Sequence, residues 1–144
     1  MGQDKYDCLK LDNQLCFPLY ACAKEVVRRY KPYLDEIGLT YTQYITMMVM
    51  WEHKSLSVKE VGRYLYLDSG TLTPVLKTLE KKGLLSRKRS PEDERNLVVS
   101  LTDEGRDLKK QAALIPEKMQ NCMSLDKEDA MKLYELLHKM MKNM

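Results

Sequence analysis

The residues of this chain that are best suited to chemistry are its four cysteines, Cys8, Cys16, Cys22 and Cys122. They include no CxxC pair, and the sequence has two histidines, His53 and His138. We therefore expect no zinc or other metal site, no cofactor and no catalytic residue. A free thiol can instead be oxidised to a sulfenic acid, which condenses with a second thiol.

A second group with useful chemistry is the basic segment from Lys77 to Arg95. It holds seven basic and four acidic side chains, and this difference equals the whole formal net charge of the chain, +3. A local basic surface fits a polyanion such as DNA. A solvated surface without a partner is the alternative that charge alone leaves open.

The elements that must position these residues are mostly helices. Apolar residues spaced by three or four predict a first helix from about Leu11 to Ile37. Pro18 should either kink this helix or lie in the first turn of a helix that starts later. Cys16 stands two residues before this proline, so the local geometry of its backbone stays open.

The middle of the chain carries clear helix boundaries. Two patterns predict capping boxes at helix starts, Thr40 with Gln43 and Ser57 with Glu60. Asp68 or Ser69 should begin a fourth helix that Gly83 ends. The short segments 84–89 and 96–101 flank the polar turn SPEDER and predict a β-hairpin.

The C-terminal third again predicts helices. Thr102 should cap a fifth helix, which Pro116 should kink, and a last helix should begin near Asp126. The predicted fold is therefore mostly α with a small β-hairpin wing, which is the order of a winged helix-turn-helix. Such a protein places the start of its recognition helix in the major groove and its wing on phosphates or in the minor groove.

The expected partner is double-stranded DNA. The candidate contacts lie at the start of the fourth helix and along the hairpin: Asp68, Ser69, Gly70, Thr71, Thr73, Pro74, Lys77, Arg87, Arg89, Asp93 and Arg95. Gly70 permits a close approach to the duplex, and the backbone amides of the helix start suit a phosphate. A two-fold dimer requires a pseudo-palindromic operator.

The stretch LDSGTLTPVLKTLEKKGLLSRKRSPEDERNLVVSLTDEG resembles the MarR family of winged-helix regulators, and Asp93-Glu94-Arg95 matches the Asp-x-Arg signature of its wing. NQLCFPLY and YKPYLDEIGLTYTQYITMMVMWE resemble the organic hydroperoxide resistance regulators within it. The resemblance implies one MarR-like domain over 1–144, with residues 1–39 and 102–144 forming a homodimer and 40–101 binding DNA. It also implies a repressor that organic hydroperoxide inactivates.

The same resemblance implies that Cys16 is the reactive cysteine and that Tyr30 and Tyr41 line its pocket. Tyrosine hydroxyls can donate to sulfur while their rings provide an apolar wall. Cys16 and Tyr30 are fourteen residues apart, about four turns of a continuous helix. Their contact must therefore come across the dimer or from a bend at Pro18.

The thiol that traps the oxidised Cys16 is less determined. Cys22 lies about 9 Å along a helix, beyond the ~7 Å Cα limit of a disulfide. Cys8 belongs to an N-terminal start that we expect to be flexible. Cys122 follows Leu108, Ala112, Ile115 and Met119 on one predicted helix face, and we favour Cys122 of a second subunit. Capture of a small cellular thiol remains open.

Two alternative functions are a ligand-responsive repressor and a thiol peroxidase. A MarR-type repressor can be released by a small aromatic ligand, and a thiol peroxidase would use a cysteine catalytically, although no partner base stands near Cys16 in the sequence.

The polar N-terminus lacks a secretory pattern, and no apolar run approaches the ~18 residues of a membrane span. We therefore expect a cytoplasmic protein that is not an enzyme and has no membrane segment.

Overall fold

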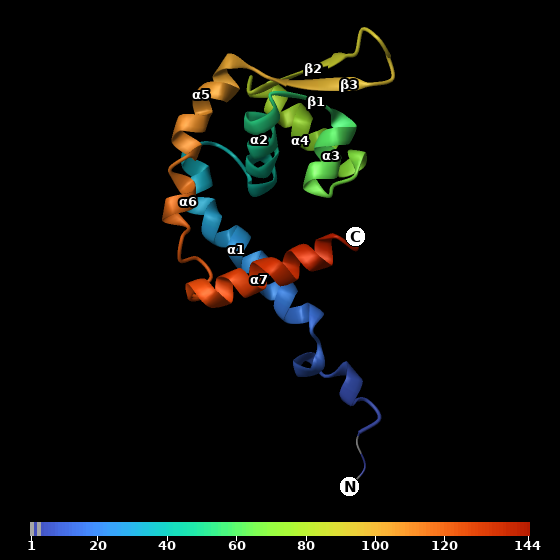
Figure 1. The fold of residues 1–144 in the computed structure, drawn as a ribbon, viewed down its shortest axis with the longest axis vertical. Coiled ribbons are helices and arrows are strands. Elements are labelled where there is room, and N and C mark those ends of the chain that lie inside the picture. The colour runs from blue at the N-terminus through green and yellow to red at the C-terminus, as the bar shows by residue number, and fades with distance from the viewer. Residues whose placement is uncertain (1, 3) are drawn as a thin grey trace. The chain divides into compact units, whose positions relative to one another are not determined.

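The computed structural model describes residues 2 and 4–144, and most of these lie in helices (Figure 1). In chain order the elements are η1 (Asp7–Leu9), η2 (Leu11–Asn13), α1 (Cys16–Glu36), α2 (Tyr41–His53), β1 (Ser55–Ser57), α3 (Val58–Leu65), α4 (Ser69–Lys81), β2 (Leu85–Arg89), β3 (Leu97–Leu101), α5 (Asp103–Ala112), α6 (Ile115–Lys118) and α7 (Lys127–Met141). The predicted fold class, mostly α with a hairpin wing, is confirmed.

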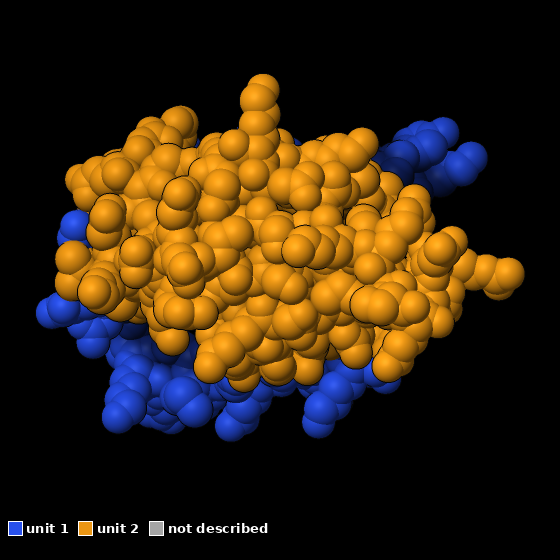
Figure 2. Space-filling view, turned by 90° about the horizontal axis from the view of Figure 1, so that it is seen from above, with its two compact units in different colours: residues 1–29, 117–144 blue, residues 30–116 orange. Residues whose placement is uncertain are grey.

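The chain divides into two compact units, which Figure 2 distinguishes by colour. Unit 1 contains residues 1–29 and 117–144, and unit 2 contains residues 30–116. The boundary falls within α1, which is assigned as one α-helix over its whole length.

The helix α1 starts later than Leu11, and the second of the two alternatives predicted for Pro18 is confirmed. The helix begins at Cys16 and not near Leu11, so Pro18 lies in its first turn, where a missing N–H removes no helical hydrogen bond. The residues before α1 also form hydrogen bonds with one another. Asn13 Nδ2 donates to the Asp7 carbonyl at 2.7 Å, and Gln14 Nε2 donates to the Cys8 carbonyl at 2.6 Å.

The predicted helix caps are present. The Thr40 hydroxyl accepts from the Gln43 N–H at 3.2 Å, and the Gln43 side chain accepts from the Thr40 N–H at 3.1 Å. Ser57 and Glu60 form the second capping box in the same way. Gly83 follows α4 with φ of 78°, a left-handed conformation that glycine adopts without a Cβ clash.

The sheet of unit 2 has the order β1-β3-β2 and is antiparallel throughout. Strand β1 was not predicted, and it pairs Ser55 with Ser100. Helices α2, α3 and α4 lie on one side of this sheet (Figure 1). The most deeply buried side chains come from these helices, α1, β2 and β3: Leu34, Met47, Met50, Val61, Leu72, Leu76, Leu79, Leu85 and Val99.

The segment after α5 corrects the prediction of a kinked helix. α5 ends at Ala112 because the ring of Pro116 would clash with that carbonyl in a continuous helix, and a separate short helix, α6, follows. Cys122 therefore lies in a turn and not on the stripe of a helix. Among the described residues, no helix is long and apolar enough to span a membrane, and no group of three metal-ligating side chains forms.

Candidate functional site

Helix α4 separates a buried side from an exposed side, as a recognition helix requires. Leu72, Leu76 and Leu79 are completely buried and hold the helix against the core of unit 2. The positions opposite these leucines are exposed and run along the helix: Gly70, Pro74, Lys77 and Lys81. The outer surface of α4 is thus available to a groove of DNA along its whole length.

The start of α4 is fixed by Asp68. Its Oδ1 accepts from the Thr71 N–H at 2.7 Å, and this bond is the main reason that the pKa of Asp68 lies below its usual range. The Thr73 hydroxyl donates to the Ser69 carbonyl at 2.6 Å. Ser69, Gly70 and Thr71 are exposed, so the first turn presents small polar groups to solvent.

The wing is the turn between β2 and β3, and its tip is ordered by its own side chains. Asp93 Oδ1 accepts from the Arg95 N–H at 3.0 Å, and Arg89 Nη1 donates to the Glu94 carbonyl at 2.8 Å. The side chain of Arg95 is exposed. Arg87 differs from the other two arginines, because Glu80 of α4 binds its guanidinium at 3.2 Å.

A groove of about 890 Å³ lies among α3, the start of α4 and the base of the wing. Its polar lining includes Lys59, Arg63, Asp68, Ser69, Arg95 and Asn96. Lys59 and Arg63 were not among the predicted DNA contacts. Their spacing of four on an expected helix would have placed both on one face, but only the packing of α3 beside α4 brings them to this groove.

Cys16 is the first residue of α1 and is exposed. The first turn of a helix carries backbone N–H groups without helical partners, and such groups favour a nearby negative charge. Cys8 and Cys22 are also exposed, whereas Cys122 is half-buried.

The two predicted pocket tyrosines lie together in unit 2. The rings of Tyr30 and Tyr41 have centroids 5.0 Å apart, and Tyr44 lies 5.8 Å from Tyr30 and 6.3 Å from Tyr41. Burial raises the pKa of Tyr44, and the neighbouring Tyr41 raises it further. Tyr44 is thus a third ring of this cluster, and it was not among the predicted site residues.

Comparison with known proteins identifies the family. Residues 28–112 match the model of the transcriptional regulator SarA/Rot family. The organic hydroperoxide resistance transcriptional regulator of Bacillus subtilis is 46% identical over 142 residues, which is 99% of this chain and 97% of that protein. The relation therefore extends through both units.

Solved structures agree with the sequence match. Reduced AbfR bound to DNA, a protein of Staphylococcus epidermidis, matches with a TM-score of 0.76 and 32% identity over 96% of this chain and 97% of that chain. A cysteine-to-serine variant of MarR from E. coli with operator DNA gives a TM-score of 0.82 at 23% identity, covering 96% and 99% of the two chains, and supports the fold. The chain therefore belongs to the SarA/Rot family of transcriptional regulators and to the family of the organic hydroperoxide resistance regulator, and it has the winged-helix fold of MarR.

Proposed function

We propose that this chain is a repressor that binds a pseudo-palindromic DNA operator as a homodimer and leaves it when an organic hydroperoxide oxidises Cys16. The observation that carries the DNA part is the exposed polar start of α4, which three buried leucines hold in place. Lys77, Arg89 and Arg95 supply positive charge on the helix and the wing. The half-sites should lie about one helical turn apart, as two-fold dimers require.

The proposed dimer rests on the apolar surface of unit 1. This unit exposes many large hydrophobic side chains, including Leu15, Leu19, Tyr20, Val27, Met131, Tyr134, Leu136 and Met140. No residue of α7 is buried within the chain, although the helix is amphipathic. Apolar surface of this extent favours burial against a partner. We therefore assign 1–39 and 102–144 to dimerisation and 40–101 to DNA binding.

The sensing chemistry begins at Cys16. Its thiolate attacks the outer peroxide oxygen, so that an S–O bond forms, the O–O bond breaks, and the alkoxide leaves and takes up a proton as an alcohol. The sulfur loses the two electrons that the hydroperoxide gains. Within one chain, no other described part of the fold covers Cys16, so the chain itself leaves the sulfur open to an oxidant.

The hydroxyl groups of Tyr30 and Tyr41 are proposed to donate hydrogen bonds to the Cys16 sulfur of a second copy. Cys16 and Tyr30 are fourteen residues apart in the sequence, about four turns of a continuous helix, and Pro18 lies in the first turn of α1. We therefore propose that the thiol meets the tyrosines of a second chain. The close packing of the tyrosine rings supports their acting as one pocket wall.

Cys122 of the second copy is the proposed trap for the sulfenic acid. Its thiol attacks the sulfur of Cys16, the S–S bond forms, and the S–O bond breaks with release of water. AbfR, a relative, has been seen in overoxidised and disulfide forms. Cys8 and a small cellular thiol remain the other candidates, and Cys122 is preferred because it is the half-buried cysteine.

A DNA-binding assay with two kinds of signal molecule tests the proposal. Reduced protein should bind the DNA upstream of its own gene, and organic hydroperoxide should release it, while a salicylate-like acid should not. Release by the aromatic acid alone would favour the ligand-responsive repressor.

We further propose that the protein acts in the cytoplasm and is not an enzyme. Sustained peroxide turnover with a recycling thiol would instead favour the thiol peroxidase.

A further inference from the structure

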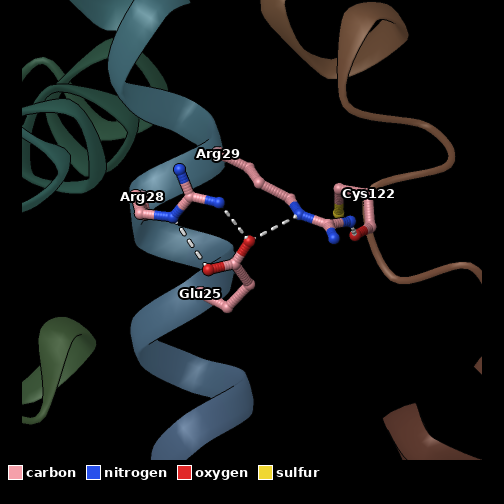
Figure 3. A network of polar contacts seen from close by, with 4 residues as sticks. All are labelled: Glu25, Arg28, Arg29 and Cys122. Atoms are coloured by element: carbon pink, nitrogen blue, oxygen red, sulfur yellow. Dashed lines mark hydrogen bonds and ion pairs between the residues drawn. The ribbon is translucent and has the colours of Figure 1, made fainter.

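Glu25 of α1 binds two arginines that follow it on the same helix (Figure 3). Arg28 donates from Nε to Oε2 at 2.8 Å and from Nη2 to Oε1 at 2.6 Å, and Arg29 donates from Nε to Oε1 at 3.2 Å. These bonds, above all those from Arg28, hold the pKa of Glu25 at about 2, well below its usual range. The carboxylate is therefore ionised at neutral pH.

Arg29 differs from Arg28 because it also has a partner outside the helix. Its Nη1 donates to the backbone carbonyl of Cys122, which lies in the turn between α6 and α7 (Figure 3). Backbone bonds close this turn, from the Cys122 N–H to the Met119 carbonyl at 3.0 Å and from the Ser124 N–H to the Asn121 carbonyl at 3.2 Å. Arg29 thus fixes the turn that carries the Cys122 thiol to a particular part of α1.

The place of this anchor along α1 limits what Cys122 can reach. Glu25 lies nine residues after Cys16, which is about 13 Å along the helix axis. One guanidinium bonds both Glu25 and Cys122, so Cys122 is held near this later part of the helix. A disulfide needs Cα atoms within about 7 Å. The anchor therefore keeps Cys122 away from Cys16 of its own chain.

We propose that Arg29, oriented by Glu25, is a positioning residue. It favours the reaction of Cys122 with the oxidised Cys16 of a second copy over the reaction with Cys16 of its own chain. The inference rests on the proposed function, in which the Cys122 thiol displaces water from the Cys16 sulfenic acid. Restraining the turn that carries a nucleophile reduces the entropy lost on reaction and so speeds such a displacement. Preventing the intrachain reaction also makes the product of oxidation a covalent dimer.

The test compares Arg29→Ala with Arg28→Ala, a matched control that removes a Glu25 partner but not the contact with Cys122. After organic hydroperoxide, non-reducing electrophoresis and intact mass give the rates of the covalent dimer, the intrachain disulfide and overoxidised monomer. Arg29→Ala should form the covalent dimer roughly tenfold more slowly or worse and accumulate the monomeric products. Arg28→Ala should match the wild type, and Arg29→Lys, which can still donate to the carbonyl, should be intermediate.

A second measurement separates positioning from a structural defect. Trapping the sulfenic acid with a carbon nucleophile in a Cys122→Ser background should give the same rate of Cys16 oxidation with and without Arg29→Ala. A wild-type rate of covalent dimer formation in Arg29→Ala would overturn the role of Arg29 and leave the sensor proposal standing. If the wild type forms no dimer that depends on Cys122, the second-thiol assignment and this inference are both wrong, whereas hydroperoxide release of DNA would still support Cys16 as the sensor.

Discussion

Arg87 of β2 is bound to Glu80 of α4 by both its backbone and its side chain. The Arg87 N–H donates to Glu80 Oε2 at 3.0 Å, and Nη2 donates to Oε1 at 3.2 Å. The side-chain bond from Arg87 is the main cause that holds the pKa of Glu80 below its usual range. Only 16% of the Arg87 side chain is exposed. This pair joins the proposed recognition helix to the base of the wing.

Two arginines of the hairpin should consequently behave differently. Arg95→Ala should weaken DNA binding and reduce the slope of log affinity against log salt by about one, because an exposed phosphate or groove contact releases a counterion. Arg87→Ala should also weaken binding but leave the slope unchanged, since the charge of Arg87 is already paired with Glu80. Fluorescence anisotropy of a labelled operator at several salt concentrations measures both. A salt slope that falls in Arg87→Ala and not in Arg95→Ala would reverse these assignments.

Protonation of Asp68 at acid pH should lower the stability of the DNA-binding region. Asp68→Ala removes the acceptor for the Thr71 N–H, and thermal unfolding at pH 7 should occur at lower temperature than in the wild type, whereas Asp68→Asn should keep most of the stability. The folded pKa is lowered, so the contribution of this carboxylate is complete above its unfolded pKa of about 3.9 and is lost as the pH falls through the folded value. A wild-type advantage over Asp68→Ala that grows below pH 4 would contradict this cause.

Gly70→Ala separates helix stability from DNA binding. A Cβ at this position would have Asp68 Oδ1 at 3.4 Å as its nearest neighbour, so there is room for it. Alanine should stabilise the helix by about 0.5–1 kcal/mol in chemical denaturation. Affinity for the operator should nevertheless fall, because the added methyl group would face the duplex in the proposed complex. Equal or tighter binding would show that close approach at Gly70 is not needed.

Much of the DNA-binding region could be predicted because its boundaries depend on neighbouring residues. The contacts that define these boundaries join residues a few positions apart, so the sequence alone indicates them. They are the capping boxes at Thr40 and Ser57 and the helix end at Gly83. Strand β1 could not be found in this way. Its three residues are extended because they pair with β3, more than forty positions later in the chain.

The candidate sensor shows where local patterns fail. The spacing of Ala112, Ile115 and Met119 correctly indicated buried positions, but Pro116 ended the helix before the pattern reached Cys122. The bond from Arg29 to the Cys122 carbonyl joins positions 93 residues apart, and no sequence spacing predicts it. Tertiary packing likewise determines the approach of Tyr44 to Tyr30 and Tyr41.

The tyrosine pocket predicts a kinetic effect without an effect on DNA. Tyr30→Phe and Tyr41→Phe should each slow the oxidation of Cys16 by roughly tenfold, because each would remove a hydroxyl that we propose donates a hydrogen bond to this sulfur. Operator affinity of the reduced variants should equal that of the wild type. Tyr64→Phe, on α3 and stacked on His53 with centroids 4.5 Å apart, is the control and should oxidise normally. Stopped-flow measurement of thiol loss gives the rates, and unchanged rates in both pocket variants would remove the tyrosines from the sensor.

Oxidation of Cys16 should cause release from DNA, and one titration tests this link. Wild type and Cys16→Ser are each bound to a labelled operator, and fluorescence anisotropy is followed while organic hydroperoxide is added. We predict that both bind the operator with similar affinity, that the wild type is released, and that Cys16→Ser stays bound because serine cannot form a sulfenic acid. Release of Cys16→Ser at the same hydroperoxide concentration as the wild type would show that Cys16 is not the sensing residue.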